Sequence, residues 1–198
     1  VMKIAWKIKQ AMYVMAVITV IIIVAYFLWL LSLRKKDINK VEYMLEVEKS
    51  LFDAHKHTEN VDNTLGKVAD YMKAETAFFT KVKNGIIDEV YCWSNKENFD
   101  INAAENRPVK VVIPGFNGDG TSMKFGKKLY NLRDCGLPYD YYIDSYIVTS
   151  VYDVKKRFVG VLGVVNMDKV WKNADYIENV AGTFSLAVNN ISSYQSLR

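Results

Sequence analysis

The pattern around which the folded part of the chain is organised lies between residues 143 and 167. Its first arm, residues 143–152, is rich in Ile, Val, Tyr and Thr, side chains that suit the pleated surface of a sheet. Its second arm, residues 158–165, is apolar at both odd and even positions, so neither face of a strand there could be left in water. A charged turn at 153–157 separates the arms. The pattern predicts two strands that run on into a helix, the second strand being central and covered on both faces.

Another pair of strands and a helix are predicted upstream. Residues 60–74 place apolar side chains on one face at a period of 3.6, which predicts a helix. Residues 75–82 and 86–93 have the composition of strands. The intervening Asn84-Gly85 is the strongest short signal for a hairpin turn, so these two strands should pair with each other.

The middle of the chain is less regular. A polar segment covers residues 94–107, and Pro108 opens a short predicted strand at 109–113. Residues 116–141 are punctuated by glycines, with a short helix expected at 123–132. A long irregular segment inside a domain is typical of a lid or a binding loop. We therefore expect residues 116–141 to close over a site.

The last predicted element is an amphipathic helix at residues 174–197. Gly182 inside it costs about 1 kcal/mol relative to Ala, and a close approach of the helix to the sheet would explain its presence. Gly160 and Gly163 lie inside the central strand, where glycine marks the close approach of another backbone, of the closing helix or of a ligand.

Taken in order, these elements predict an α+β fold. One antiparallel sheet with helices on one face and the lid over the other would bury both faces of the central strand. That plan leaves a pocket between sheet and lid. The residues expected to line it are mostly aromatic, with one thiol and one amide: Trp93, Phe116, Phe125, Cys135, Tyr141, Tyr142 and Asn166.

A long uncharged run precedes this domain. Residues 11–33 form 23 consecutive positions without a charge, and as a helix they would be roughly 34 Å long, enough to cross a hydrocarbon core of about 30 Å. The run ends in Arg34-Lys35-Lys36, a stop-transfer pattern, whereas a signal peptide would be shorter and end in a cleavage site. We therefore predict one transmembrane helix.

The chain then divides into five parts. They are a basic juxtamembrane segment (1–10), the transmembrane helix (11–33), a linker helix (34–59), a folded domain (60–192) and the start of an output linker (193–198). The first residue is Val and the last helix has no stop signal before Arg198. We therefore expect an excerpt of a longer protein whose output domain is missing.

The linker helix carries an apolar stripe at a 3-4 spacing. This spacing suits a short parallel dimer, and a helix that folds back onto its own domain would use such a stripe equally well. Both interpretations stay open. The stripe consists of Ile38, Val41, Leu45, Phe52 and His55, with Met44 and Leu51 alongside.

The formal net charge of +4 does not indicate nucleic-acid binding. Lys3, Lys7 and Lys9 supply three of these charges ahead of the apolar run, so the rest of the chain is nearly neutral. No basic stripe with interleaved aromatic residues is present. The larger basic cluster follows the run, which predicts a cytoplasmic domain at the inner or plasma membrane. That cluster consists of Arg34, Lys35, Lys36 and Lys40.

The sequence contains no catalytic or metal-binding constellation that we could identify. Cys92 and Cys135 are too few for a disulfide scaffold and fit a reducing compartment, with a redox pair or a covalent attachment point as alternatives to buried thiols. His55 and His57 lie on different sides of a helix, and no metal motif accompanies them. The glycine-rich segment 118–128 fails the phosphate-loop and calcium-loop spacings.

Two stretches resemble the ends of a GAF domain, residues 65–93 and 143–190, with Gly160-Val161-Leu162-Gly163-Val164-Val165-Asn166 as the more specific part. The resemblance implies a GAF/PAS-like fold that binds a small ligand or relays a signal as a dimer. A membrane helix, a linker helix and such a domain together are similar to bacterial membrane-anchored diguanylate cyclases. The family's cyclic-nucleotide pattern matches at Asn166 but has Lys where this chain has Met167.

Three functions are consistent with this sequence. The first is a non-catalytic sensory or relay domain that passes a signal from the membrane to a C-terminal output domain, with no cofactor identified. The second is an extracellular Cache-type ligand sensor, since Val151-Tyr152-Asp153 and residues 160–164 also suit that family. The third is a thiol enzyme, because some GAF-type proteins reduce methionine sulfoxide with cysteines.

Overall fold

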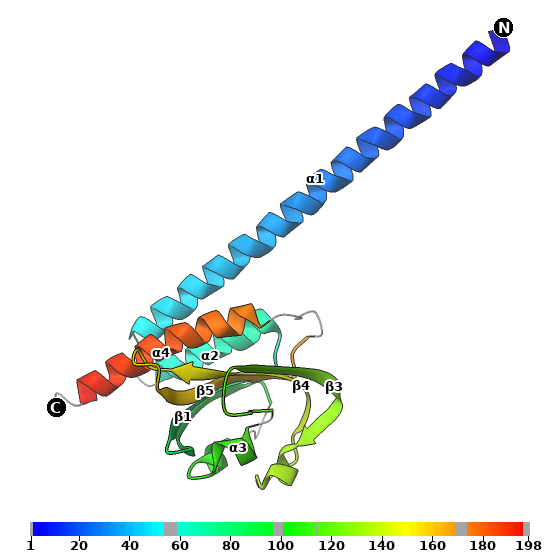
Figure 1. The fold of residues 1–198 in the computed structure, drawn as a ribbon. Helices are drawn as coiled ribbons and strands as arrows, with labels where there is room; N and C mark the ends of the chain where they lie inside the picture. Colours follow the sequence, from blue (N-terminus) through cyan, green and yellow to red (C-terminus); the bar gives the residue numbers. More distant parts are fainter. Residues whose placement is uncertain (1, 54–58, 97–100, 114, 169–173, 196–198) are drawn as a thin grey trace. The chain divides into compact units, whose positions relative to one another are not determined.

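The structure of the protein is a computed structural model that describes residues 2–53, 59–96, 101–113, 115–168 and 174–195. The chain forms two units, residues 1–42 and 43–198. The second unit combines a sheet with helices (Figure 1). In chain order the elements are α1 (Met2–Asp53), α2 (Glu59–Met72), β1 (Thr76–Lys83), β2 (Ile86–Ser94), η1 (Asn102–Ala104), α3 (Val109–Val112), β3 (Thr121–Asn131), η2 (Leu132–Cys135), β4 (Tyr142–Tyr152), β5 (Phe158–Val165) and α4 (Asp175–Gln195).

The five strands form one antiparallel sheet in the order β2-β1-β5-β4-β3. The predicted central strand, β5, lies in the middle of this order and pairs with β1 on one side and β4 on the other. Val161, Leu162 and Val164 are fully buried. The prediction of a central strand covered on both faces is therefore confirmed.

The β1–β2 hairpin also forms as predicted. Asn84 and Gly85 both have positive φ, 54° and 78°, as a two-residue type I′ turn requires. Asn tolerates this left-handed region better than most residues, and glycine has no Cβ to oppose it. The local sequence thus determines the pairing of Lys83 with Ile86 and of the strands that follow.

One face of the sheet is covered by helices, and we call it the helical face. Helix α2 packs on β1 and β2, and α4 packs on β4 and β5. Side chains alternate along β1, so Ala77 and Phe79 point toward the helices while Phe78 points away. The buried core on this face also contains Val47, Leu51, Leu65, Val68, Met72, Ile147, Val151, Leu162, Val164, Tyr176, Ile177, Val180 and Phe184.

Short segments cover the other face, which we call the cover face. We define the cover as residues 101–113, 115, 116 and 132–141. The cover reaches the β1–β2 hairpin through backbone hydrogen bonds, including Ile87 N to Arg107 O at 2.9 Å and Val109 N to Gly85 O at 3.0 Å. Its buried apolar side chains complete a second core with Phe78, Val161 and Val165: Ile101, Ala104, Val109, Val112, Ile113, Phe116, Leu132, Leu137 and Tyr141.

Two predictions in the middle of the chain are wrong. The expected strand at 109–113 is the single helical turn α3. Pro108 has extended dihedrals (φ −62°, ψ 127°) and precedes the first helical residue, a position where its missing N–H costs nothing. One helical turn then puts Val109, Val112 and Ile113 on the same side, and all three are buried.

The expected helix at 123–132 is instead the edge strand β3, which pairs with β4. The residues 116–141 therefore form only part of the cover and also complete the sheet. An edge strand carries lysines that discourage pairing with other chains, here Lys124, Lys127 and Lys128. The register shifts between Phe125 and Tyr130, so the alternation expected of a strand is interrupted.

The close approach of another backbone explains Gly160, as predicted, whereas side chains surround Gly163. A Cβ on Gly163 would overlap the Phe78 ring, and one on Gly160 would overlap the carbonyl oxygen of Thr80. Strand β1 therefore makes the close approach, and neither the closing helix nor a ligand is required. Gly182 in α4 is exposed and has no atom within 4 Å of its Cβ position, so the predicted close helix–sheet approach at Gly182 is wrong.

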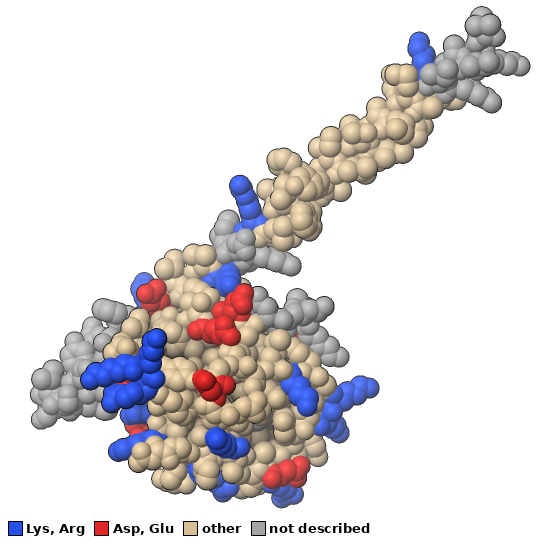
Figure 2. Space-filling view, viewed as in Figure 1, with Lys and Arg blue, Asp and Glu red and all other residues tan. Residues whose placement is uncertain are grey.

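The first unit is helical. Its side chains are exposed throughout residues 11–33, and Figure 2 shows no acidic or basic side chain along that part of the helix. Among the described residues, one helix, Lys9–Leu51, is long and apolar enough to cross a membrane. On the visible face of the second unit, acidic and basic side chains are interspersed (Figure 2).

The last turns of α1 have two apolar faces. Val47 and Leu51 are buried in the core of the second unit, with Met44 beside them. Val41 and Leu45, which belong to the predicted stripe, are 59% and 60% exposed. The helix thus folds onto its own domain with one face and leaves the other open. His55 and His57 lie outside the described residues.

Candidate functional site

The predicted pocket lies between the sheet and the cover, but side chains fill most of it. A cavity of about 10 Å³ remains, room for roughly one water molecule. Thr76 and Tyr141 contribute the hydroxyl groups of its lining. The other lining residues are apolar: Phe78, Ile101, Val112, Ile113, Leu132, Leu137, Ile143 and Val165.

Of the seven predicted lining residues, Tyr141 and Asn166 lie in or next to this cavity, and Phe116 lies in the same core without lining it. Tyr141 lines it, and Phe116 is buried in the same core, where its ring stacks on Phe158 at 5.5 Å between centroids. Asn166 lies at the polar end, with Nδ2 3.4 Å from the Tyr141 hydroxyl. Cys135 is half-buried at the end of η2, which belongs to the cover.

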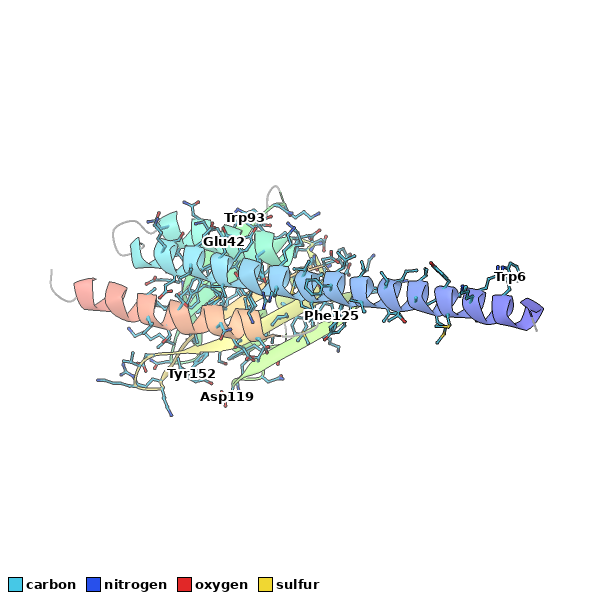
Figure 3. The ribbon with its side chains drawn as sticks, turned by 90° about the horizontal axis from the view of Figure 1, so that it is seen from above. Trp6, Glu42, Trp93, Asp119, Phe125 and Tyr152 are labelled. Atoms are coloured by element: carbon cyan, nitrogen blue, oxygen red, sulfur yellow. The ribbon has the colours of Figure 1, made fainter. Side chains whose placement is uncertain are left out.

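The other three predicted residues lie elsewhere. Trp93 packs on the helical face against α2, where a Cβ on Gly66 would lie 2.9 Å from its ring. Phe125 and Tyr142 are 36% and 48% exposed, and Tyr142 stacks under the Lys128 ammonium group. Figure 3 shows Trp93 and Phe125 well apart, because they come from the two opposite edge strands of the sheet.

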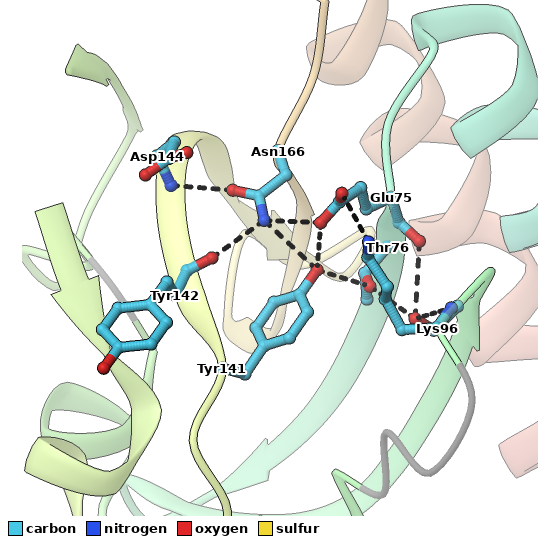
Figure 4. A network of polar contacts seen from close by, with 8 residues as sticks. Glu75, Thr76, Lys96, Tyr141, Tyr142, Asp144 and Asn166 are labelled. Carbon is cyan, nitrogen blue, oxygen red and sulfur yellow. Dashed lines mark hydrogen bonds and ion pairs between the residues drawn. The ribbon is translucent and has the colours of Figure 1, made fainter. Parts of the chain in front are cut away.

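Asn166 is the centre of a polar network that includes Tyr141 of the cavity lining (Figure 4). It directly follows β5 and has φ 54°, a left-handed conformation that Asn tolerates. Its Nδ2 donates to Glu75 Oε2 at 2.7 Å and to the Tyr142 carbonyl at 2.9 Å. Its Oδ1 accepts from the Asp144 amide at 2.7 Å. One amide side chain thus connects three separate segments.

Tyr141 connects the cover to the same network. Its hydroxyl donates to Glu75 Oε2 at 3.3 Å and lies 3.1 Å from Thr76 Oγ1. Burial raises the pKa of Tyr141, and the nearby Glu75 carboxylate raises it further, so the phenol stays protonated at neutral pH. Lys96 completes the network with an ion pair of 3.0 Å to Glu75 Oε1.

This network lies where the helices join the sheet. Glu75 stands between α2 and β1, and its amide lies 3.2 Å from each of the carbonyl oxygens of Val165 and Asn166. Asp168 N donates to Lys73 O at 3.2 Å on the same side. The end of α2 and the chain that leaves β5 are therefore bound to each other, and Tyr141 binds the cover to both.

The groups described in this network are hydrogen-bonded or ion-paired to one another, and none is an evident nucleophile. Burial raises the pKa of the Cys135 thiol, and the neighbouring Asp134 carboxylate adds to the effect. A raised pKa lowers the thiolate fraction on which cysteine reactivity depends. Cys92 is half-buried on the cover face. Within the described residues, no group of three or more His, Cys, Asp or Glu side chains could hold a metal ion.

Sequence reasoning missed Glu75, Thr76 and Lys96. No local signal could have found them, because Glu75 and Asn166 are 91 positions apart in the chain. A single carboxylate before a strand is common on any surface. Only the pairing of β1 with β5 brings this one to Asn166.

No protein-family model matches the sequence, and no curated relative matches it either. Solved structures do match. A free methionine-R-sulfoxide reductase from Neisseria meningitidis, in complex with its substrate, has a TM-score of 0.59 at 14% identity, covering 78% of this chain and 91% of that one.

Two further similar structures are GAF domains. The phycoerythrobilin-bound GAF domain of a cyanobacterial phytochrome has a TM-score of 0.53 at 10% identity, covering 75% of this chain and 95% of that one. The GAF domain of an Acinetobacter phosphoenolpyruvate-protein phosphotransferase has a TM-score of 0.53 at 13% identity, covering 77% and 94%. The chain therefore has a GAF-like α+β fold, and identities this low establish the fold alone.

Proposed function

We propose that this chain is a non-catalytic sensory and relay module of a membrane-anchored signalling protein. It receives a signal through the membrane and linker helix, through a small ligand, or through both, and passes it along α4 to an output domain that follows Arg198. The GAF-like fold supports this proposal, because its structural neighbours include bilin-bound GAF domains of cyanobacterial phytochromes.

The observation that carries the proposal is the network around Asn166. The cover lies over the face of the sheet that the helices leave open, and Tyr141 ties the cover to Glu75 and Asn166. Those two residues stand at the end of α2 and at the exit from β5. A change in the cover is thus linked by hydrogen bonds to both helix junctions, and a shift of about 1–3 kcal/mol between two packings suffices for signalling.

A ligand enclosed by this domain requires the cover to move. The present cavity of about 10 Å³ is far below the several hundred Å³ typical of small-molecule pockets. The lining of this cavity carries no charged side chain. The nearby Glu75 carboxylate, which accepts a hydrogen bond from the Tyr141 hydroxyl, would repel an anionic ligand. We therefore expect a small neutral ligand, and we do not expect a cyclic nucleotide.

The open face of the linker helix supports a parallel homodimer. Val41 and Leu45 are exposed while Val47 and Leu51 are buried in the protein's own core, so dimerisation and fold-back use different faces of one helix. Coiled-coil helices bury such a stripe against a second copy. Membrane insertion of residues 11–33 would keep two copies parallel.

The relay can be tested by fusing this chain to the catalytic domain of a diguanylate cyclase and measuring cyclic di-GMP synthesis in membranes. Asn166→Ala removes the hydrogen bonds to Glu75, Tyr142 and Asp144, and we expect the synthesis rate to change by at least about 5-fold. Asn117→Ala is the matched control, because Asn117 is exposed and its side-chain amide lies 3.3 Å from Ser122 Oγ, outside the network. A folded Asn166→Ala protein with the parental rate would contradict the relay.

Dimerisation and orientation have their own tests. With Cys92 and Cys135 replaced by Ser, Leu45→Cys should cross-link two copies on oxidation, whereas the buried Val47→Cys should not. Equal cross-linking at both positions would argue against the proposed dimer face. Labelling of Cys135 from outside intact cells would reverse the orientation and favour the Cache-type extracellular sensor.

A thiol-dependent reductase is the second candidate, favoured by the fold shared with the Neisseria enzyme. The raised pKa of Cys135 argues against it. Incubating the purified protein with free methionine sulfoxide and a dithiol reductant decides the matter. Methionine formation that is lost in the Cys92→Ser, Cys135→Ser double variant would establish the reductase, and no formation above background would exclude it for this substrate.

A further inference from the structure

Three tyrosines from three helices meet on the helical face. The ring centroid of Tyr71 on α2 lies 4.6 Å from that of Tyr43 on α1 and 4.4 Å from that of Tyr176 on α4. The interplanar angles are 48° and 43°. Aromatic rings at such distances attract each other beyond the burial of their area. Tyr71 thus bridges the helix that enters the domain and the helix that leaves it.

The cluster is buried at its α4 end. Tyr176 is 1% exposed and is among the largest fully buried side chains of the described residues. Burial raises its pKa, and the neighbouring Tyr71, Tyr43 and Glu46 raise it further.

The three tyrosines lie where movement of α1 would reach the start of α4. Tyr43 is the first residue of the second unit, and Val47 and Leu51 follow it at i+4 and i+8 on the buried face of α1. Tyr176 is the second residue of α4. A rotation or shift of α1 must therefore move Tyr43 against Tyr71 and, through it, the first turn of α4. Packed cores do not deform continuously, so such a change favours a switch between discrete packings.

We propose that Tyr43, Tyr71 and Tyr176 form a joint that couples movement of α1 to the first turns of α4. This proposal rests on the relay function above and names its mechanical route on the helical face. It is independent of the Asn166 network, which acts through the cover face.

The joint is tested by amide hydrogen exchange on the full chain in detergent micelles. Tyr43→Ala removes the α1 ring and leaves the rest of α1 in place, so we expect exchange to rise by about tenfold in the first turns of α4, with the amides of β4 and β5 unchanged. Tyr43→Phe keeps the ring and should behave like the parent protein. Lys49→Ala is the control, because Lys49 is exposed on the same helix and lies outside the proposed dimer stripe, and it should leave α4 unchanged.

Two outcomes would overturn the joint. One is unchanged exchange in α4 with Tyr43→Ala, and the other is an equal rise in β4 and β5, which would show general destabilisation. Val47→Ala separates the joint from the relay, since Val47 is fully buried in the same core. If Val47→Ala raises exchange in α4 and Tyr43→Ala does not, the relay stands and the tyrosine joint falls. If neither variant raises exchange in α4, α1 is not coupled to α4. The tyrosine joint then fails, and so does a relay from α1 to α4 along the helical face.

Discussion

The helical face of the sheet is covered by two long helices, α2 with 14 residues and α4 with 21 residues. On the cover face the longest described helix has four residues. The helical face buries large apolar side chains such as Phe79 and Phe184, whose rings lie 5.2 Å apart. The cover face retains a small cavity and ends in a hydrogen-bonded polar network. Long helices bury a continuous apolar stripe, while short turns fill a surface piecewise and leave gaps.

If the chain relays a signal as proposed, the two faces have separate tasks. The helical face, where α1, α2 and α4 share one core, suits the transmission of movement between helices. The cover face is packed less continuously. It is attached to the rest of the domain through the Tyr141 hydroxyl, which donates to Glu75, and through the Arg107 carbonyl, which accepts from the Ile87 amide. Regions with few buried contacts open locally at lower cost. We therefore expect the cover to open locally before the helical face does.

The largest expected effect comes from the two adjacent phenylalanines of β1. Phe79→Ala on the helical face should lower the free energy of unfolding by about 3–5 kcal/mol, because a buried ring is lost and long helices cannot collapse into the space. Phe78→Ala on the cover face should cost at least about 1 kcal/mol less, since the short cover segments can settle inward. Denaturant unfolding followed by circular dichroism measures both. A larger loss for Phe78→Ala would invert the comparison.

A smaller effect is expected where β1 covers a glycine of β5. Gly163→Ala places a methyl group against the Phe78 ring and 2.9 Å from the Val148 side chain, so the cover face must shift at a cost of roughly 1–3 kcal/mol. Phe78→Leu in the same chain makes room and should recover part of this loss. Additive destabilisation in the double variant, measured by the same unfolding experiment, would show that the two residues do not compete for space.

Gly182 offers a change in the opposite direction. It is exposed in α4 with nothing within 4 Å of its Cβ position, so Gly182→Ala should stabilise the domain by up to about 1 kcal/mol through helix propensity alone. The melting temperature should rise by a few degrees. A fall in the melting temperature would reveal packing against this face of α4, by a second copy for example.

The smallest effect at neutral pH is expected at the β4–β5 turn, which belongs to neither face. Backbone hydrogen bonding from Arg157 lowers the pKa of Asp153 below its ordinary value of 3.8, and the Arg157 guanidinium and the Lys155 amide lower it further. This contribution to stability is present above pH about 4 and is lost as the pH falls through the lowered pKa.

Asp153→Asn keeps an oxygen acceptor for the amides of Lys155 and Arg157 and removes the titration. The melting temperature of the variant should therefore decline less steeply below pH about 4 than that of the parent. Parallel declines for the two proteins would show that Asp153 does not titrate on unfolding.

Local sequence predicts the elements whose pattern repeats along the chain. The helices α2 and α4 are predictable, because a period of 3.6 reports which face is buried. The strands β1, β2 and β4 are predictable from their composition, and β5 from its continuous apolar run. The Asn84-Gly85 turn follows from backbone sterics alone. The glycine pattern predicts the lid as a single segment, whereas the structure divides the covering of the sheet between two stretches around the edge strand β3.

The candidate site is predictable only in part. Tyr141 and Phe116 can be named as aromatic residues of an irregular segment, and Asn166 as a polar residue at the end of an apolar strand. Glu75 cannot be named, because its partner lies beyond a strand that becomes its neighbour only in the sheet. Phe125 and Trp93 are aromatic like Tyr141, and the sequence predicts them to line the pocket for the same reason. They lie on edge strands away from the cavity.

Hydrophobicity and steric limits within a few residues account for the uncharged helix at 11–33, the central strand β5 and the two predicted hairpins. These features can therefore be read from the amino-acid order without knowledge of the fold. Three others arise only when the chain packs: which face of α1 is buried, the use of residues 121–131 as an edge strand, and the meeting of Glu75, Tyr141 and Asn166. They depend on what each segment packs against, and a neighbour 91 positions away leaves no trace in the local pattern.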